Sequence, residues 1–327
     1  MKHANSGGII MKKGLLVTAA LALTLVLAAC GKSQTSDSKQ VKIGILQLVD
    51  QSALNASRKG FEEGLKEAGY SGKKVKIDYV NAQGDQANLK TMSERLANDH
   101  NTLNLAIATP AAQALQKADS KTPMLFTAIT DAKSAGLVTD LKKPDANATG
   151  VTDKVDVLGQ IKFLHKLFPK AKTVGVLYNA AEQNSVFQVK EAKKAITSLG
   201  LKMVANTAAT TNDVEQATMA LTKKADVLYI PNDNVAAAAM PTIGKVSEKT
   251  KTPVINADAT MVKFAGVATR GISYEELGKQ TAKMAVKLIK GDKVSDLPVE
   301  NPEKTELVTD KSRMKLFGIT EDMVKGA

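Results

Sequence analysis

The stretch VKIGILQLVDQSALNASRKGFEEGLKEAGYSGKKVKIDYV, Val41 to Val80, decides the fold predicted for this chain. It opens with the apolar run Val41–Leu48, which is typical of a buried strand. Residues 52–68 then carry apolar side chains at helical spacing and end at a glycine. A second strand-like segment follows at 74–80. Strand, helix and strand in this order predict two parallel strands joined by a right-handed crossover.

The same unit repeats along the rest of the chain. Further strands are predicted at 103–108, 123–129, 173–178, 201–207, 225–230, 253–257 and 266–272, and further helices at 85–99, 110–118, 155–168, 182–199, 213–223, 234–249 and 274–290. The late segment 300–310 also has strand character. The alternation restarts after 147–153, so we expect an α/β protein with two domains, each built on a doubly wound parallel sheet.

We expect the chain to pass between these domains more than once. Lobe 1 is predicted to comprise residues 41–152 plus about 267–298, and lobe 2 residues 153–266 plus about 299–327. The crossings fall near 149–153, 268–272 and 297–302. Several parallel connections of this kind form a hinge and not a loose linker.

The first forty residues predict secretion and anchoring. Lys12 and Lys13 precede the apolar run Leu15–Ala29, which is too short for a permanent membrane span, so residues 1–29 are predicted to be a signal peptide. Leu27–Cys30 resembles the bacterial lipobox, and Cys30 is the only cysteine. We expect acyl chains, palmitate among them, on Cys30 and a flexible tether over 30–40. This predicts a lipid-anchored, extracytoplasmic protein on the bacterial cell membrane. An ordinary cleavage site beside a chance cysteine is the alternative.

Composition and motifs argue against several classes of protein. The formal net charge is +12, but the lysines are dispersed among acidic residues and only 4% of residues are aromatic, so no nucleic-acid partner is expected. The three histidines lack metal-ligand partners at useful spacing. No nucleophile elbow, P-loop or dinucleotide-binding motif occurs. We therefore expect neither an enzyme nor a cofactor nor a bound metal.

Ligands of open parallel sheets bind outside the carboxyl ends of the strands. The candidate ligand-binding residues follow those ends, and they are Gln47, Asp50, Leu54, Thr109, Ala112, Thr130, Asp131, Tyr178, Glu182, Asn184, Ser185, Asp233, Asn234 and Asp258. Each polar residue among them also has a simpler interpretation as a helix cap. Together, helix N-termini suit a carboxylate, whereas Asp131, Glu182 and Asp233 suit an ammonium group. This mixed polarity predicts an amino acid as the ligand.

Six blocks carry a resemblance to a known family: IATPAAQAL (107–115), PMLFTAITDAKSAGLV (123–138), NATGVTD (147–153), VGVLYNAAEQNS (174–185), ADVLYIPNDNVAAAAM (225–240) and GISYEELGKQTAKMAVKLIKGD (271–292). From about Val41 to Val324 the chain resembles the ABC-transporter substrate-binding lipoproteins of the tryptophan/tyrosine-binding type. The resemblance implies a type I periplasmic-binding-protein fold with three hinge crossings. It also implies capture of an aromatic amino acid for a membrane permease and its ATPase.

The resemblance also implies roles for single residues. Thr109 and Ala112 would meet the ligand carboxylate from one lobe, with Asn184 and Ser185 from the other. Asp233 would take the ammonium group, with Asn234 and Thr130 near it.

The chain departs from the family at two places. Gln51-Ser52 stands where His-Pro is frequent, and Asp131-Ala132 stands where Asp-Pro is common. The first change alters the expected ring pocket, so the preference for tryptophan stays open. A sugar- or nucleoside-binding lipoprotein, or a ligand sensor without transport, remains the alternative.

Overall fold

The computed structural model describes residues 40–327. The predicted signal peptide, Cys30 and the tether up to residue 39 lie outside the described residues. The described chain contains two parallel sheets and one small antiparallel sheet. Within it, no helix is both long enough and apolar enough to cross a membrane.

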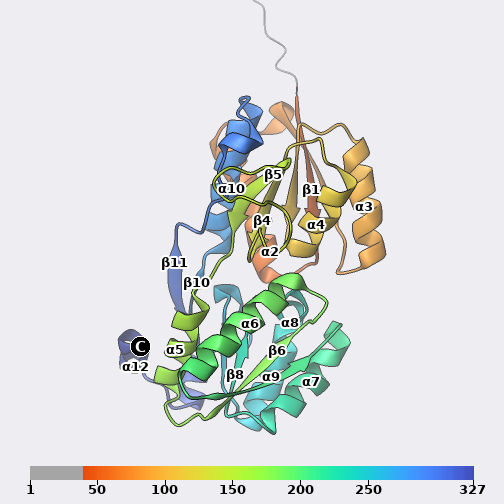
Figure 1. Cartoon of the computed structure of the whole chain (residues 1–327). Helices are drawn as coiled ribbons and strands as arrows, with labels where there is room; N and C mark the ends of the chain where they lie inside the picture. Colours follow the sequence, from red (N-terminus) through yellow and green to blue (C-terminus); the bar gives the residue numbers. More distant parts are fainter. Residues whose placement is uncertain (1–39) are drawn as a thin grey trace, which may run out of the picture. The chain divides into compact units, whose positions relative to one another are not determined.

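The first lobe is built on a five-stranded parallel sheet in the order β2-β1-β3-β4-β5 (Figure 1). Its elements are β1 (Val41–Gln47), α2 (Ser52–Glu67), β2 (Val75–Asn81), α3 (Gln86–Asn98), β3 (Leu103–Ile107), α4 (Thr109–Ala118), β4 (Met124–Ile129), β5 (Ala148–Thr152) and the late helix α10 (Tyr274–Ile289). Helix α2 packs on α10, and α3 packs on α4. The apolar strand runs seen in the sequence are therefore covered on both faces, as a parallel sheet requires.

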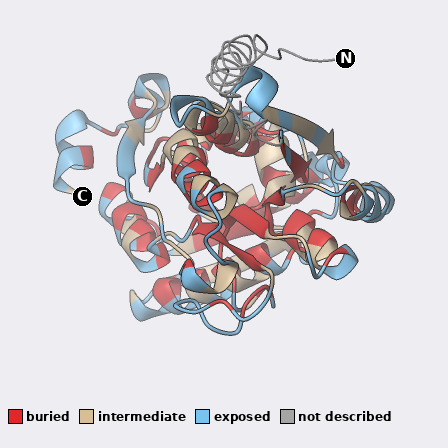
Figure 2. Ribbon diagram, turned by 90° about the horizontal axis from the view of Figure 1, so that it is seen from above, coloured by how far each residue is buried: buried red, intermediate tan, exposed pale blue. Residues whose placement is uncertain are grey.

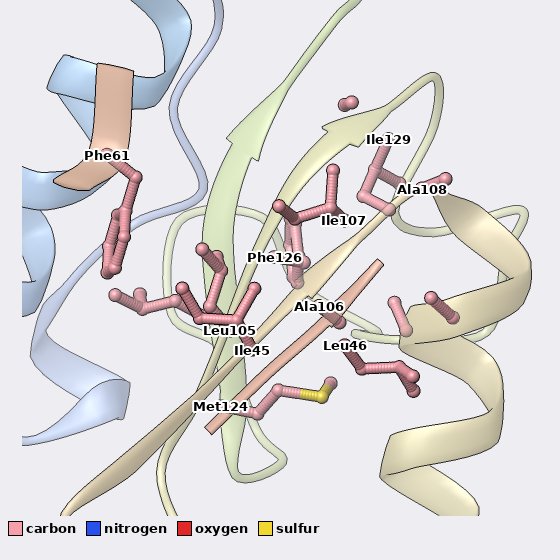
Figure 3. Packing of buried hydrophobic residues seen from close by; sticks show 14 of the residues in the cluster. Ile45, Leu46, Phe61, Leu105, Ala106, Ile107, Ala108, Met124, Phe126 and Ile129 are labelled. Atoms are coloured by element: carbon pink, nitrogen blue, oxygen red, sulfur yellow. The ribbon is translucent and has the colours of Figure 1, made fainter. Parts of the chain in front are cut away.

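The core of this lobe joins strand and helix side chains. Ile45, Leu105 and Phe126 come from three neighbouring strands, and Phe61 comes from α2 (Figure 3). All four side chains are fully buried. The buried cluster also takes in residues of α10, which ties the late segment to the first lobe.

The second lobe is built on a four-stranded parallel sheet in the order β7-β6-β8-β9. Its elements are α5 (Val157–Leu167), β6 (Thr173–Tyr178), α6 (Gln183–Ser198), β7 (Lys202–Thr207), α7 (Val214–Thr222), β8 (Val227–Ile230), α8 (Asn234–Ala238), α9 (Met240–Thr250) and β9 (Val254–Asn256). Two buried clusters cover its two faces, one with α5 and α6 and one with α7 and α9. In Figure 2 buried residues line the strands and inner helix faces, and exposed residues lie outside.

Three segments connect the lobes. Strands β10 (Ala268–Ile272) and β11 (Thr305–Thr309) form an antiparallel pair. Beside them the backbone of Glu300 exchanges hydrogen bonds with the segment that leaves β5: it donates to the Gly150 carbonyl at 2.9 Å and accepts from the Thr152 N–H at 2.9 Å. Two short helices, α11 (Lys311–Leu316) and α12 (Glu321–Gly326), end the chain, and short 3-10 turns occupy Gly72–Lys74, Thr211–Asp213, Ala259–Met261 and Val294–Asp296.

Two predicted elements differ from the structure. The single helix expected over 234–249 is divided into α8 and α9 at Ala239. Pro241 explains the break, because it lacks the N–H that would continue the hydrogen-bond ladder of α8, whereas proline is tolerated in the first turn of α9. Residues 148–152 were expected only as a crossing, yet they form β5, the edge strand of the first sheet.

Candidate functional site

A small cavity of about 20 Å³ lies where the carboxyl ends of strands from both sheets meet. Six of the residues predicted from the sequence line it: Leu54, Thr130, Asn184, Asp233, Asn234 and Asp258. The sequence analysis did not single out four further polar residues of the lining, which are Gln51, Asp153, Asn232 and Tyr274. Gln51 was noted only as a departure from the family. No lysine or arginine lines this cavity.

A wider cavity of about 850 Å³ opens beside the small one. Helices α3 and α4 contribute Leu89 and Pro110, and the second lobe contributes Glu182, Asn234 and Val235. Asn234 lines both cavities. Both cavities therefore reach the start of α8.

Glu182 is held among amides of the second lobe. Its Oε2 accepts from the Asn234 side chain at 2.6 Å and from the Asn184 side chain at 3.3 Å, and its Oε1 accepts from the Asn179 side chain at 3.4 Å. Burial raises the pKa of Glu182, and the neighbouring Asp233 carboxylate raises it further. The group thus lies buried beside a second acid, without a basic partner.

Both carboxylate oxygens of Asp233 accept hydrogen bonds from backbone N–H groups. Its Oδ1 accepts from the Ala236 N–H at 2.8 Å, which caps α8, and its Oδ2 accepts from the Asn179 N–H at 2.5 Å. Burial raises the pKa of this carboxyl against the effect of these bonds. The capping role that the sequence analysis held open for Asp233 is therefore present in the structure.

Asp153 lies between the lobes, directly after β5. Its Oδ2 accepts from the Tyr274 hydroxyl at 2.8 Å and from the Asn232 side chain at 3.2 Å. Burial raises the pKa of Asp153, and burial beside this carboxylate also raises that of Tyr274. The only earlier signal for Asp153 was its place at the end of the block NATGVTD.

Asp258 completes the acidic lining. Its Oδ1 accepts from the Thr260 N–H at 2.6 Å, and its Oδ2 accepts from the Thr260 hydroxyl at 3.0 Å. Burial raises the pKa of Asp258 to about 7. Two acids of this lining therefore come from the loops after β8 and β9, and one comes from the crossing.

The start of α4 faces the site from the first lobe. This ten-residue helix has no side-chain cap, and its preceding residue, Ala108, adopts a left-handed φ of 85°. The Thr109 hydroxyl is buried without a hydrogen-bond partner. Ala128 of β4 also has a positive φ, 57°. Strained alanines at two neighbouring strand ends are typical of a functional site. Thr109 and Ala112 are buried, but neither lines the small cavity.

Five other predicted residues also lie outside the lining of the small cavity. They are Gln47, Asp50, Asp131, Tyr178 and Ser185. The Gln47 amide donates to the Asn55 side chain at 2.7 Å, and Asp50 accepts from the same side chain at 2.5 Å. Asp131 caps the turn at Ser134, accepting from its N–H at 2.6 Å. Tyr178 packs against the second-lobe core, and Ser185 is fully buried.

Direct hydrogen bonds join the lobes around the site. The Gln188 amide of α6 donates to the Thr130 hydroxyl at 3.2 Å, and the Gln113 amide of α4 donates to the Gln183 oxygen at 2.9 Å. Gln183 in turn donates to the Ser134 carbonyl. The structure thus shows the lobes in contact over the cavity. Among residues 40–327, no three His, Cys, Asp or Glu side chains are arranged to hold a metal ion.

Comparison with known proteins agrees with this architecture. The profile of the family described as ABC transporter substrate binding protein matches residues 42–325. A tyrosine-binding protein of Clostridioides difficile (strain R20291) is 36% identical over 283 residues, which cover 86% of this chain and 82% of that protein.

Two solved structures are similar over most of the chain. A Streptococcus pneumonia ABC domain in complex with L-Trp is 37% identical, with a TM-score of 0.85 over 88% of this chain and 99% of that one. A ligand-free, open substrate binding protein from Clostridium difficile is 40% identical, with a TM-score of 0.67 over 86% and 96%. The lower score against the open structure, despite higher identity, agrees with the lobe contacts described above. The predicted α/β fold with two parallel sheets is confirmed.

Proposed function

Because the chain belongs to the family of ABC transporter substrate-binding proteins, we propose that its ligand is an amino acid with an aromatic side chain. Two relatives support this choice, one named for tyrosine and one solved with L-Trp. Binding and delivery of a solute, without chemistry on it, is the role that follows.

The observation that carries the proposal is the polarity of the small cavity. Asp153, Asp233 and Asp258 line it, Glu182 lies beside it, and no lysine or arginine joins them. Buried acids without a basic partner are costly, so a cationic group of the ligand would relieve this cost. The ammonium group of an amino acid has the required charge and three hydrogen-bond donors.

The start of α4 suits the carboxylate of the same ligand. Its first N–H groups have no side-chain cap, and the helix dipole places partial positive charge there. The unpaired Thr109 hydroxyl could donate a further hydrogen bond. The apolar part of the wider cavity, including Leu89, Pro110 and Val235, would then accommodate the ring.

Ligand entry requires the lobes to separate. A cavity of about 20 Å³ accommodates roughly one water molecule, not an amino acid. The ligand would therefore bind to an open form, and contacts from the second lobe would favour closure by differential affinity. The closed pair of lobes would be presented to a permease with its ATPase. The predicted lipid on Cys30 would keep the protein at the outer face of the bacterial membrane.

Tryptophan fluorescence tests the ligand directly. The chain contains no tryptophan, so bound L-tryptophan would be the only indole emitter. We expect a shifted emission spectrum and a rise in anisotropy when protein is added to L-tryptophan, and no change with indole alone. If both signals stay unchanged, tryptophan is removed from the candidates. Calorimetry against L-tyrosine, other amino acids, nucleosides and sugars then decides the ligand class, and a sugar or nucleoside as sole binder would contradict the proposal.

A further inference from the structure

Among the four buried carboxylates at the site, Asp153 differs from the others in its hydrogen bonding. Both oxygens of Asp233 and of Asp258 accept hydrogen bonds, and both oxygens of Glu182 accept from amide side chains. Asp153 uses only Oδ2, for Tyr274 and Asn232. Its Oδ1 is buried and has no hydrogen-bond partner among the described residues. An acceptor left in this condition is costly unless a donor arrives.

Two amide side chains next to Asp153 also have an oxygen without a hydrogen-bond partner in the described part of the chain. Asn232 Oδ1 and Asn184 Oδ1 are both buried without a partner. The orientation of each amide follows from its nitrogen: Asn232 Nδ2 donates to Asp153 Oδ2 at 3.2 Å, and Asn184 Nδ2 donates to the Asn232 carbonyl at 2.9 Å. Turning either amide would place two oxygens against each other. The three side chains are thus linked in sequence, and each presents one unpaired acceptor.

The exposure of these side chains excludes bulk water as their ordinary partner. Asp153 is 3% exposed, Asn184 is 6% exposed and Asn232 is 7% exposed. All three line the small cavity between the lobes. The neighbouring group on the first lobe is the Thr130 hydroxyl, which accepts from the Gln188 amide. Thr130 also lowers the pKa of Asp153 against the effect of burial, although no hydrogen bond joins Thr130 to Asp153 Oδ1. Three acceptors around one cavity match the three N–H donors of an ammonium group.

We propose that Asp153 is the residue that receives the ligand's ammonium group, with the amide oxygens of Asn232 and Asn184 accepting its other two hydrogen bonds. This assignment rests on the proposed function, because it requires a ligand with an amino group. It replaces Asp233, which the sequence analysis favoured, as the ammonium partner. Asp233 holds the backbone of the second lobe and has no free oxygen.

The position of Asp153 connects the ammonium group to both lobes. Asp153 follows β5 in the crossing, Tyr274 begins α10 of the first lobe, and Asn232 follows β8 of the second lobe. The Asp153 N–H also donates to the Ile129 carbonyl at 2.9 Å, which fixes its backbone to the first sheet. An ammonium group bound there would hold Asn232 and Asn184 of the second lobe against a carboxylate fixed to the first. Ligand charge would thereby favour the closed form.

Asp153→Asn tests the assignment, because it removes the charge and preserves the shape. We expect calorimetry to show affinity for L-tryptophan or L-tyrosine about 100-fold lower than in the unchanged protein, as for loss of a buried charged partner. The desamino analogues, indole-3-propionate and 3-(4-hydroxyphenyl)propionate, have no ammonium group. Their affinity should not fall, so the preference for the amino acid over its analogue should decrease by a similar factor.

Asp156→Asn is the matched control. Asp156 is exposed, lies three residues further along the same crossing and caps α5, a role that asparagine fills equally well. This variant loses the same charge and should keep the preference unchanged. If Asp153→Asn does not fold, Asn232→Ala replaces it, with an expected decrease in preference of about 10-fold.

The outcomes separate the two proposals. Unchanged preference in a folded Asp153→Asn protein, or in Asn232→Ala where that variant replaces it, overturns the assignment of Asp153 while amino-acid binding stands. If the unchanged protein binds neither L-tryptophan nor L-tyrosine nor another amino acid, the proposed function fails, and the assignment fails with it.

Discussion

At the scale of single residues, the site depends on which polar atoms are already occupied. Asp233 and Asp258 both follow a strand and both cap the segment after it, so their oxygens are used locally. Asp153 Oδ1, in contrast, accepts no hydrogen bond from the segment that follows it. Residue type alone does not distinguish these carboxylates, because a cap and a ligand contact need the same acceptor.

The buried acids predict how stability depends on pH. Burial raises the pKa of Asp258 to about 7, and its unfolded value is close to 3.8. The folded protein therefore binds this proton more tightly, so the stabilisation is present at low pH and is lost as pH rises through about 7. We expect the free energy of unfolding of the ligand-free protein to fall by roughly 1 kcal/mol per pH unit for this group between about pH 4 and pH 7.

Thermal unfolding between pH 5 and 8 measures this effect. Asp258→Asn keeps an acceptor for the Thr260 N–H and should show a smaller change with pH. Carboxylates with lowered pKa values, such as Asp119, have finished titrating below this range. A melting temperature that rises with pH in the unchanged protein would contradict the expectation.

At the scale of elements, the close packing of α2 on α10 positions Tyr274, the residue at the start of α10 that lines the small cavity. A Cβ at Gly60 would collide with the Glu275 carbonyl, and one at Gly278 with the Ser57 carbonyl. The Ser57 hydroxyl also donates to the Tyr274 carbonyl at 3.3 Å. Two glycines thus let the helices approach, and this approach holds Tyr274 beside Asp153.

Gly278→Ala should separate these helices. We expect the free energy of unfolding to fall by about 1–3 kcal/mol, because the added methyl group meets backbone that cannot rotate away. Chemical denaturation measures the change. Gly326→Ala in α12 is the matched control, since a Cβ there meets no atom within 4 Å. Equal denaturation midpoints for the two variants would show that the contact between α2 and α10 does not limit the stability of the protein.

At the scale of the whole molecule, closure depends on a few hydrogen bonds between lobes. Gln183 of the second lobe accepts from Gln113 and donates to the Ser134 carbonyl, both in the first lobe. These bonds exist only while the lobes are in contact. They contribute to ligand affinity through the closed form and little to the stability of either lobe.

Gln183→Ala removes both bonds. We expect affinity for L-tryptophan or L-tyrosine to fall about 10-fold, as two exposed hydrogen bonds suggest, with an almost unchanged melting temperature of the ligand-free protein. Calorimetry measures the affinity, and Gln116→Ala is the control because Gln116 bonds to Leu137 within the first lobe. An affinity equal to that of the control would exclude these bonds as a closing contact.

The sequence by itself determined the layers of the fold and predicted which loops could bind a ligand. Apolar runs such as Val41–Leu48 reveal a buried strand because hydrophobic periodicity is local, and a strand end is visible as soon as the strand is. Thr130, Asn184, Asp233, Asn234 and Asp258 were found in this way. The break at Ala239 was also visible in principle, since Pro241 lies two residues further along the chain.

Only the tertiary structure decided which of the acids keeps an oxygen without a hydrogen-bond partner. Asp153 meets Asn232 across 79 residues of sequence and Tyr274 across 121. No local sequence pattern predicts these contacts, because they form only when the two lobes close around the three crossings of the chain. Hydrogen-bond saturation is a property of the assembled site. The sequence therefore predicted loops that line the cavity, and the packed structure separated the carboxylates that hold the backbone from the one whose Oδ1 has no hydrogen-bond partner within residues 40–327.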